Sequence, residues 1–228
     1  LTNIFVNINI MTINQTVDVF YSFRSPYCYL LTSRLLALQE KFDVSITIRP
    51  VYPIAIRDPD FFKRTNKLYR PYHLKDSERL AKYLNIPYRR PIPDPIIQDL
   101  KTGHIEQKQP YIRNITCMAQ ASSDEGCGLK FASAVMSLIW NGHTDNWHKG
   151  DAIERACNSV GINYATLNNK LQKNLDSYEA KIAKNQTAQL DAGHWGVPLM
   201  VFNKEAFYGQ DRFEILCWRL KEQKLQTQ

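Results

Sequence analysis

The chain has 228 residues, of which 44% are hydrophobic and 22% charged, and its formal net charge is +7. This length suits one large domain or two small ones, and the composition excludes collagen-like, low-complexity and wholly disordered chains. No run approaches the roughly 20 consecutive apolar residues that a membrane-spanning helix requires, which excludes an integral membrane protein built on such helices.

The first part of the chain carries the pattern of a strand, a helix and a second strand. Residues 17–23 alternate β-branched and aromatic residues with polar ones, as strands do. Ser25 and Pro26 follow, and these residue types favour the N-cap and first position of a helix. Residues 27–42 carry leucines at helical spacing, and residues 44–50 alternate again. We therefore predict two parallel strands joined by a helical crossover.

The middle of the chain is predicted to be helical apart from two irregular stretches. Residues 53–71 are irregular and basic, and residues 87–95 contain four prolines, which break regular structure. Helical periodicity predicts the following helices: residues 72–84, 111–122, 129–141, 149–160, 164–173 and 176–190.

The end of the chain returns to strands. Residues 198–202 form an apolar run, residues 203–205 suit a turn and residues 206–208 suit a second strand, so we predict a hairpin. A final amphipathic helix follows the segment 209–212.

The order of elements is that of an α/β thioredoxin-like domain with a large all-helical insertion. We expect residues 17–52 and 191–228 to form the thioredoxin-like domain and residues 53–190 to form the insertion. Residues 1–16 are expected to be a poorly ordered N-terminal extension.

The positive charge is concentrated in one region. Residues 57–90 hold ten basic and four acidic residues, a local excess of +6. A basic patch suits nucleic acid, an anionic surface or small anionic substrates, and it is equally often a solvated helical face. Because no nucleic-acid-binding motif accompanies the patch, we expect no specific nucleic-acid partner and no membrane partner.

The five cysteines are odd in number and widely spaced, without a Cys-x-x-Cys pair or histidines at zinc-binding spacing. They are Cys28, Cys117, Cys127, Cys157 and Cys217. This usage indicates a reducing compartment and mostly buried thiols. Residues 1–10 also lack the basic start of a signal peptide. We therefore expect a cytoplasmic protein without a disulfide framework or a metal site.

The first candidate site is the junction between the first strand and the first helix, at Ser25 and Cys28. A helix N-terminus offers unpaired N–H groups that stabilise an anion such as a thiolate. A serine cannot form a dithiol–disulfide couple, but it can donate a hydrogen bond to a thiolate supplied by another molecule. Taken alone, Ser25 is more commonly a simple N-cap and Cys28 a core thiol.

Two further candidates lie near the C-terminus. Val197, before Pro198, can present its backbone N–H and C=O to a peptide-like ligand, although the segment can also be a plain turn. Gln210 and Asp211 stand at a helix start, where they suit the carboxylate and the ammonium of one ligand. Asp211 can equally be an ordinary N-cap.

Together these features resemble the kappa-class glutathione transferases and 2-hydroxychromene-2-carboxylate isomerases, which belong to the DsbA-like branch of the thioredoxin superfamily. The resemblance covers nearly the whole chain from Val17 onward. It is carried by FYSFRSPYCYL at 20–30, IRPV at 48–51, YHLKDSERLAKYLNIPY at 72–88 and GVPLMVFNKEAFYGQDRFEIL at 196–216.

The resemblance implies glutathione as a cosubstrate. It implies that Ser25 hydrogen-bonds the glutathione sulfur and that Val197, before a cis Pro198, pairs with the tripeptide backbone. Gln210 and Asp211 would hold the γ-glutamyl end.

The resemblance also assigns a second-substrate pocket to the basic stretch, with Asn66 and Lys67 as substrate-binding residues. It favours a homodimer, and it suggests a role in aromatic catabolism by analogy.

Two positions depart from the family pattern. Ser22 stands where the family usually has Asp, and Cys28 stands where it often has Ser or Thr. The first leaves the substrate open, and the second keeps a redox role open. The leading hypothesis is a glutathione-dependent isomerase or transferase acting on an unsaturated, carboxylated electrophile. The alternatives are a DsbA-like thiol-disulfide oxidoreductase using Cys28, and a non-catalytic scaffold.

Overall fold

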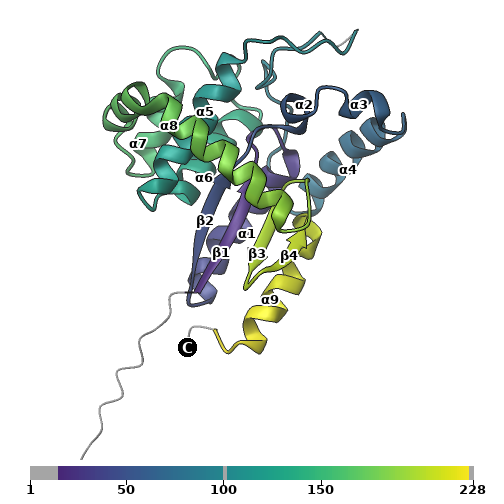
Figure 1. Ribbon diagram of the computed structural model, residues 1–228, viewed down its shortest axis with the longest axis vertical. Coiled ribbons are helices and arrows are strands. Elements are labelled where there is room, and N and C mark those ends of the chain that lie inside the picture. Colours follow the sequence, from purple (N-terminus) through teal and green to yellow (C-terminus); the bar gives the residue numbers. More distant parts are fainter. Residues whose placement is uncertain (1–14, 100–101, 226–228) are drawn as a thin grey trace, which may run out of the picture.

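The structure, a computed structural model, describes residues 15–99 and 102–225 and has a mixed sheet at its centre (Figure 1). The strands of this sheet are arranged in the order β2-β1-β3-β4. β1 (Gln15–Tyr21) pairs in parallel with β2 (Val44–Pro50), as predicted. β3 (Leu199–Phe202) pairs antiparallel with both β1 and β4 (Glu205–Tyr208), which confirms the predicted hairpin.

Helices cover both faces of the sheet. α1 (Pro26–Lys41) begins at the N-cap Ser25, as predicted, and buries its leucines against the sheet. α9 (Phe213–Glu222) follows a 3₁₀ turn, η1 (Gln210–Arg212). Arg34 of α1 hydrogen-bonds Gln210 of η1 and Glu214 of α9, which ties this end of the chain to α1. α8 (Tyr164–Asp191) crosses the opposite face (Figure 1).

The remaining helices all lie between β2 and α8 in the chain. They are α2 (Ile54–Arg57), α3 (Phe61–Arg64), α4 (Tyr69–Tyr83), α5 (Pro110–Asp124), α6 (Gly128–Trp140) and α7 (Ala152–Ser159). In Figure 1, α2, α3 and α4 lie at the upper right of the view, and α5, α6 and α7 lie at the upper left. The fold is therefore the predicted thioredoxin-like sheet with a helical insertion.

Some boundaries differ from the predictions for identifiable reasons. The stretch predicted as irregular contains α2 and α3, and α4 starts three residues before the predicted Tyr72. Pro71 does not prevent this start, because the first turn of a helix has no internal use for the missing N–H. The two helices predicted on either side of Asn174 form the single element α8, which is kinked at that residue (φ −131°, ψ 24°).

One hydrophobic core joins the sheet to the helical insertion. It runs without a break from Val19 and Leu31 to Ile112 and Phe131. The proposed division at residues 52/53 and 190/191 therefore stays a prediction. Residues 1–14 of the predicted extension lie outside the described residues, whereas Gln15 and Thr16 belong to β1.

The proline-rich loop of residues 87–95 is fastened to the start of α1 and the end of α6. The Tyr29 hydroxyl donates to the Pro87 carbonyl at 2.6 Å, and the Arg89 N–H donates to the Trp140 carbonyl at 2.8 Å. Trp147 Nε1 donates to the Pro93 carbonyl at 2.9 Å. These bonds hold the loop beside the N-terminus of α1.

Within the described ranges, no helix is both long and apolar enough to cross a membrane.

Candidate active site

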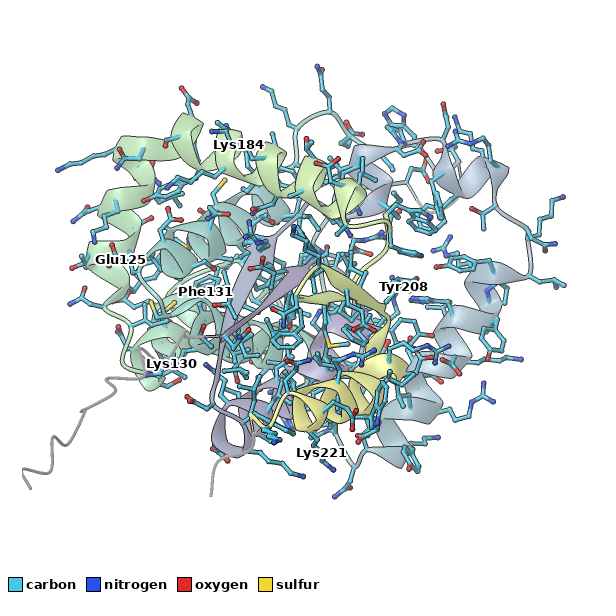
Figure 2. All side chains as sticks on the ribbon, turned by 60° about the horizontal axis from the view of Figure 1, so that its bottom comes forward. Glu125, Lys130, Phe131, Lys184, Tyr208 and Lys221 are labelled. Carbon is cyan, nitrogen blue, oxygen red and sulfur yellow. The ribbon has the colours of Figure 1, made fainter. Side chains whose placement is uncertain are left out.

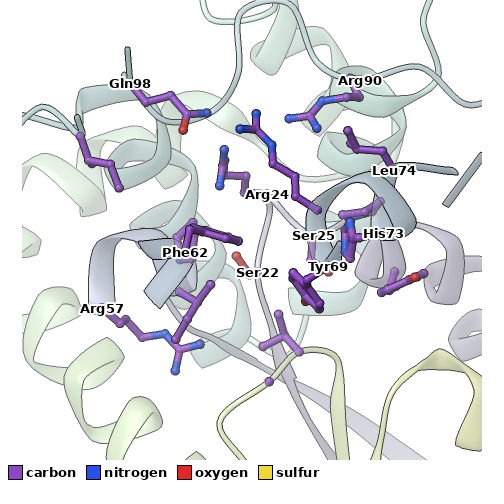
Figure 3. A pocket seen from close by; sticks show the side chains of 18 of the residues that line it. Ser22, Arg24, Ser25, Arg57, Phe62, Tyr69, His73, Leu74, Arg90 and Gln98 are labelled. Carbon is purple, nitrogen blue, oxygen red and sulfur yellow. The ribbon is translucent and has the colours of Figure 1, made fainter. Parts of the chain in front are cut away.

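A cavity of about 300 Å³ opens at the carboxyl ends of β1 and β2 (Figure 3). Its wall is formed by the N-terminus of α1, by the segment that contains α2, α3 and α4, by the proline-rich loop and by the segment before β3. The carboxyl ends of strands are where ligands bind in open α/β sheets. The cavity is therefore the candidate active site.

Ser25 borders the cavity at the start of α1. Its hydroxyl accepts a hydrogen bond from the Cys28 N–H at 3.2 Å, and its own N–H donates to the Ser22 carbonyl at 3.1 Å. Trp140 Nε1 donates to the Phe23 carbonyl at 3.0 Å and holds the connecting segment in place. Ser25 is therefore a fixed N-cap whose hydroxyl lies where the helix dipole favours an anion.

Cys28 lies on the other side of this turn. Its side chain is completely buried and is absent from the described lining of the cavity. Burial raises the pKa of the Cys28 thiol to about 12, although the Ser22 N–H, 3.5 Å from the sulfur, opposes the shift. Thiols react as thiolates, so this cysteine is a neutral core residue at physiological pH.

Val197 also borders the cavity and precedes a cis Pro198, as the sequence predicted. The carbonyls of the two residues before it are occupied: Trp195 accepts from Arg57 at 3.0 Å and Gly196 from Gln189 at 2.6 Å. In contrast, the N–H and C=O of Val197 form no hydrogen bond among the described residues. They are available to pair with a ligand backbone.

Tyr208 packs closely over Gly196. A Cβ on Gly196 would lie 2.4 Å from Tyr208 Cε2, so only glycine permits this approach. The Tyr208 ring also stacks on His194, with 3.6 Å between ring centroids. Figure 2 shows Tyr208 on the side of the sheet toward α3 and α4, away from Lys184 on α8. The aromatic contact fixes the segment that carries Val197.

Gln210 and Asp211 lie outside the described lining of the cavity. Arg34 Nη1 donates to the Gln210 carbonyl and side chain at 2.9 and 3.1 Å, and the exposed Asp211 pairs with Arg212 at 3.0 Å. However, Tyr208 borders both the cavity and a shallow depression that Asp211 lines. An extended ligand that passes Tyr208 would connect the two.

Asn66 and Lys67 are exposed in the turn before α4, and neither is among the described residues that line the cavity. The Asn66 side chain accepts a hydrogen bond from the Leu68 N–H at 2.9 Å, which stabilises the turn. From the same stretch, Lys63, Tyr69 and Arg70 do line the cavity. The structure thus brings Ser25 and Val197 together but leaves Asn66 and Lys67 apart from them.

The described lining is cationic and contains no Asp or Glu. Its basic residues are Arg24, Arg57, Lys63, Arg70 and Arg90. A concave wall of one sign raises the local concentration of ligands of the opposite sign. The cavity is therefore suited to anions.

Asp94, behind the wall, holds two of these arginines. Arg24 donates to both of its carboxylate oxygens at 2.7 and 3.0 Å, and Arg90 donates at 3.2 Å. Burial would raise the pKa of Asp94, but the two guanidinium groups and the Ile96 N–H hold that pKa below its usual value. One carboxylate for two arginines leaves a net positive charge on this side of the cavity.

Aromatic rings form much of the remaining wall, among them Tyr27, Phe62, Tyr69, Tyr88, Trp140 and Trp195. His73 packs edge-on against Tyr27 with ring centroids 4.8 Å apart, and Figure 3 shows it beside Ser25. Burial and the charges of Arg90 and Arg24 lower the pKa of His73, despite the opposing effect of Asp76. The His73 imidazole is therefore neutral near pH 7. Because the described wall combines aromatic rings with cations, the cavity suits a flat anionic ligand.

The sequence reasoning missed Arg57 and His73 as cavity residues and treated Ser22 only as a departure from a pattern. The Ser22 residue is 1% exposed and lines the cavity, and its hydroxyl has no partner among the described residues. The only sequence signal for Arg57 was its membership of the basic stretch, because two of its described hydrogen-bond partners, Gln189 and Trp195, lie more than a hundred positions away.

Comparison with known proteins identifies the fold but not the reaction. A family model described as a DSBA-like thioredoxin domain matches residues 16–221. Among curated proteins, none matches this sequence closely enough to count as a relative.

Two solved structures illustrate the range of similar proteins. A 2-hydroxychromene-2-carboxylate isomerase superposes with a TM-score of 0.66 at 20% identity, covering 92% of this chain and 97% of its own. The cytosolic disulfide reductase DsbM from Pseudomonas aeruginosa, in a structure with GSH, superposes with a TM-score of 0.58 at 14% identity, covering 90% and 99%. An isomerase and a reductase thus share this fold.

Proposed function

This chain belongs to the DSBA-like thioredoxin domain family, and we propose that it is a glutathione-dependent isomerase or transferase acting on an unsaturated, carboxylated electrophile. The observation that carries the proposal is that the capping Ser25 lines the cavity while Cys28, in the same turn, is completely buried and outside the described lining. The helix N-terminus at Ser25 suits a thiolate, but the described lining of the cavity contains no cysteine. The thiol must then come from a second molecule.

Glutathione fits the groups that surround Ser25. Val197 offers the tripeptide backbone an N–H and a C=O that form no hydrogen bond with any described residue. Asp211 lies in the adjoining depression, where it can accept from the γ-glutamyl ammonium. The structures similar to this one include a disulfide reductase described with GSH. The predicted glutathione residues Ser25, Val197, Pro198, Gln210 and Asp211 thus remain the proposed binding set.

Bound glutathione would supply a thiolate that adds to the electrophilic carbon and, after rotation about the resulting single bond, is expelled to give the isomer. Ser25 and the first N–H groups of α1 stabilise negative charge on the sulfur. The cationic wall binds the carboxylate of the electrophile, and the aromatic rings hold its flat framework. In a transferase the same residues act, but the adduct is released.

A thiol-disulfide oxidoreductase is less well supported, although such proteins share the fold. That activity needs an accessible thiolate, whereas burial raises the pKa of Cys28 to about 12. The sequence offers no second cysteine next to it.

The proposal is tested by screening α,β-unsaturated aromatic acids by ultraviolet absorbance, with and without glutathione. An isomerase returns a product of unchanged mass, and a transferase returns a product heavier by one glutathione. Calorimetry of glutathione binding to the wild type and to Asp211→Ala should show weaker binding by the variant. An absence of glutathione binding, together with insulin reduction that is lost in Cys28→Ser, would instead establish the oxidoreductase.

A further inference from the structure

Arg57 differs from its cationic neighbours in the cavity wall because it is partly buried and yet has no acidic partner among the described residues, whereas Arg70, which also has none, is exposed. Arg24 and Arg90 pair with Asp94, and Lys63 pairs with Asp60 at 2.7 Å. No carboxylate lies within ion-pair distance of Arg57 among the described residues. A partly buried charge without a counterion carries a desolvation cost, which a ligand carboxylate would offset.

The Arg57 side chain is nevertheless held rigidly. Nε donates to the Tyr52 carbonyl at 2.7 Å, Nη1 donates to the Gln189 side chain at 3.0 Å and Nη2 donates to the Trp195 carbonyl at 3.0 Å. All three acceptors are neutral. A guanidinium has five N–H groups, so two remain for a ligand after these bonds. Arg57 is thus pre-positioned, and its charge is left uncompensated.

A second group in the cavity also lacks a partner. Ser22 follows β1 and Tyr52 follows β2, the parallel neighbour of β1, so Ser22 and the anchor of Arg57 lie at the same edge of the sheet. The buried Ser22 hydroxyl has no partner among the described residues. Figure 3 shows Ser22 near the centre of the view, with Arg57 below it and Arg90 and Gln98 above it.

We propose that Arg57 and Ser22 form a carboxylate-binding subsite in the part of the cavity where β1 and β2 end. Arg57 supplies the charge and two N–H donors, and Ser22 supplies a hydroxyl donor. The inference rests on the proposed function and moves the carboxylate from the expected Asn66 and Lys67 to a different element. The carboxylate belongs either to the unsaturated substrate or to glutathione, and binding measurements with each ligand distinguish the two.

Calorimetry with trans-cinnamate, neutral cinnamamide and reduced glutathione tests the subsite. The Arg57→Met variant should bind trans-cinnamate about tenfold or more weakly, because a charge-assisted hydrogen bond is removed. Binding of cinnamamide should stay within about twofold of the wild type. The matched control is Arg64→Met, which removes the same charge from an arginine paired with Asp58 outside the described cavity lining. The control should change both affinities less than about twofold.

Ser22→Ala keeps the test decisive even where Arg57→Met disturbs the fold. Removing a buried hydroxyl without a partner in the described part of the chain should leave the melting temperature unchanged or raise it. If Ser22 binds the carboxylate, the same change should weaken trans-cinnamate binding about three- to tenfold. A purely structural serine would not give this combination.

The outcomes separate the subsite from the proposed function. If Arg57→Met and Ser22→Ala lose affinity for glutathione but not for trans-cinnamate, the subsite is supported and glutathione is its ligand. Arg57-dependent binding of trans-cinnamate by a protein that does not bind glutathione supports the subsite and contradicts the proposed function. Equal behaviour of Arg57→Met and Arg64→Met with both carboxylates overturns the subsite, as does a wild type that binds neither carboxylate.

Discussion

Ser25 and Cys28 share one hydrogen bond across the first turn of α1 yet face different surroundings. The Ser25 hydroxyl accepts from the Cys28 N–H at 3.2 Å at the edge of the cavity, whereas the Cys28 side chain is completely buried. The turn that would carry a reactive thiol in a redox protein therefore carries a hydroxyl. This arrangement favours chemistry on a thiolate brought by a ligand.

Removal of the Ser25 hydroxyl should lower the glutathione-dependent rate more than it lowers glutathione affinity. We expect Ser25→Ala to lose about tenfold or more in rate, since one donor to the developing charge is removed. The loss of the cap should also destabilise the protein by about 1 kcal/mol. Ser25→Gly is the control, because glycine caps nearly as well as serine. The glutathione-dependent rate should fall by the same factor in Ser25→Ala and Ser25→Gly, although the two variants differ in stability. Rates equal to that of the wild type would exclude a catalytic Ser25.

Cys28 should resist alkylation in the folded protein. Its thiol is buried and has a pKa raised to about 12, whereas Cys217 is only partly buried. Mass spectrometry after iodoacetamide treatment at pH 8 should find Cys217 labelled well before Cys28, which should react only in denaturant. Labelling of Cys28 as fast as Cys217 in the native protein would reopen the redox hypothesis.

Gly196→Ala should disturb the segment that carries Val197. The new Cβ would lie 2.4 Å from Tyr208 Cε2, and overpacking of this kind costs about 1–3 kcal/mol of stability. We expect weaker glutathione binding as well, measured by calorimetry. In the double variant with Tyr208→Ala, the clash is gone and the effects on unfolding free energy should not add. Simple additivity would show that the contact between the two residues is not the cause.

Asp94→Asn should destabilise the protein by on the order of 3 kcal/mol, since it leaves the largely buried Arg24 without its carboxylate. Urea unfolding measures this difference. The control is Asp60→Asn, which breaks an exposed pair with Lys63 and should cost far less stability than Asp94→Asn. Similar losses in the two variants would mean that Arg24 does not depend on Asp94.

His73 should make the folded state less stable in mild acid. Because its pKa is lowered on folding, the unfolded chain binds more protons than the folded protein around and below the unfolded pKa of about 6.5. The unfolding free energy should therefore fall as the pH drops from about 7 to 5. His73→Phe should reduce this dependence, whereas His143→Phe, at an exposed position, serves as the control. An unchanged pH dependence in His73→Phe would contradict the assignment.

Local signals in the sequence were sufficient for much of the fold. Ser25 and Pro26 marked the start of α1, and alternating residues marked β1 and β2. The break predicted between residues 173 and 176 corresponds to the kink at Asn174. These features depend on neighbouring residues, which is why a single sequence reveals them.

The cavity wall could not be predicted in the same way. Arg57 is positioned by Gln189 and Trp195, which are separated from it by more than a hundred residues. Ser22 is distinctive only because its burial leaves the hydroxyl unpaired. Asn66 and Lys67 were assigned from a resemblance, and the turn before α4 instead keeps both exposed outside the described lining.

The most direct test of the central claim is the pH titration of the glutathione thiol bound to the protein, followed by thiolate absorbance in the ultraviolet. A free thiol of this type has a pKa of about 8.5. We predict a lower pKa for the thiol of glutathione bound to the wild type and a return toward the free value in Ser25→Ala. A bound thiol that titrates like the free one, or equally in both proteins, would contradict the role of Ser25 and the start of α1.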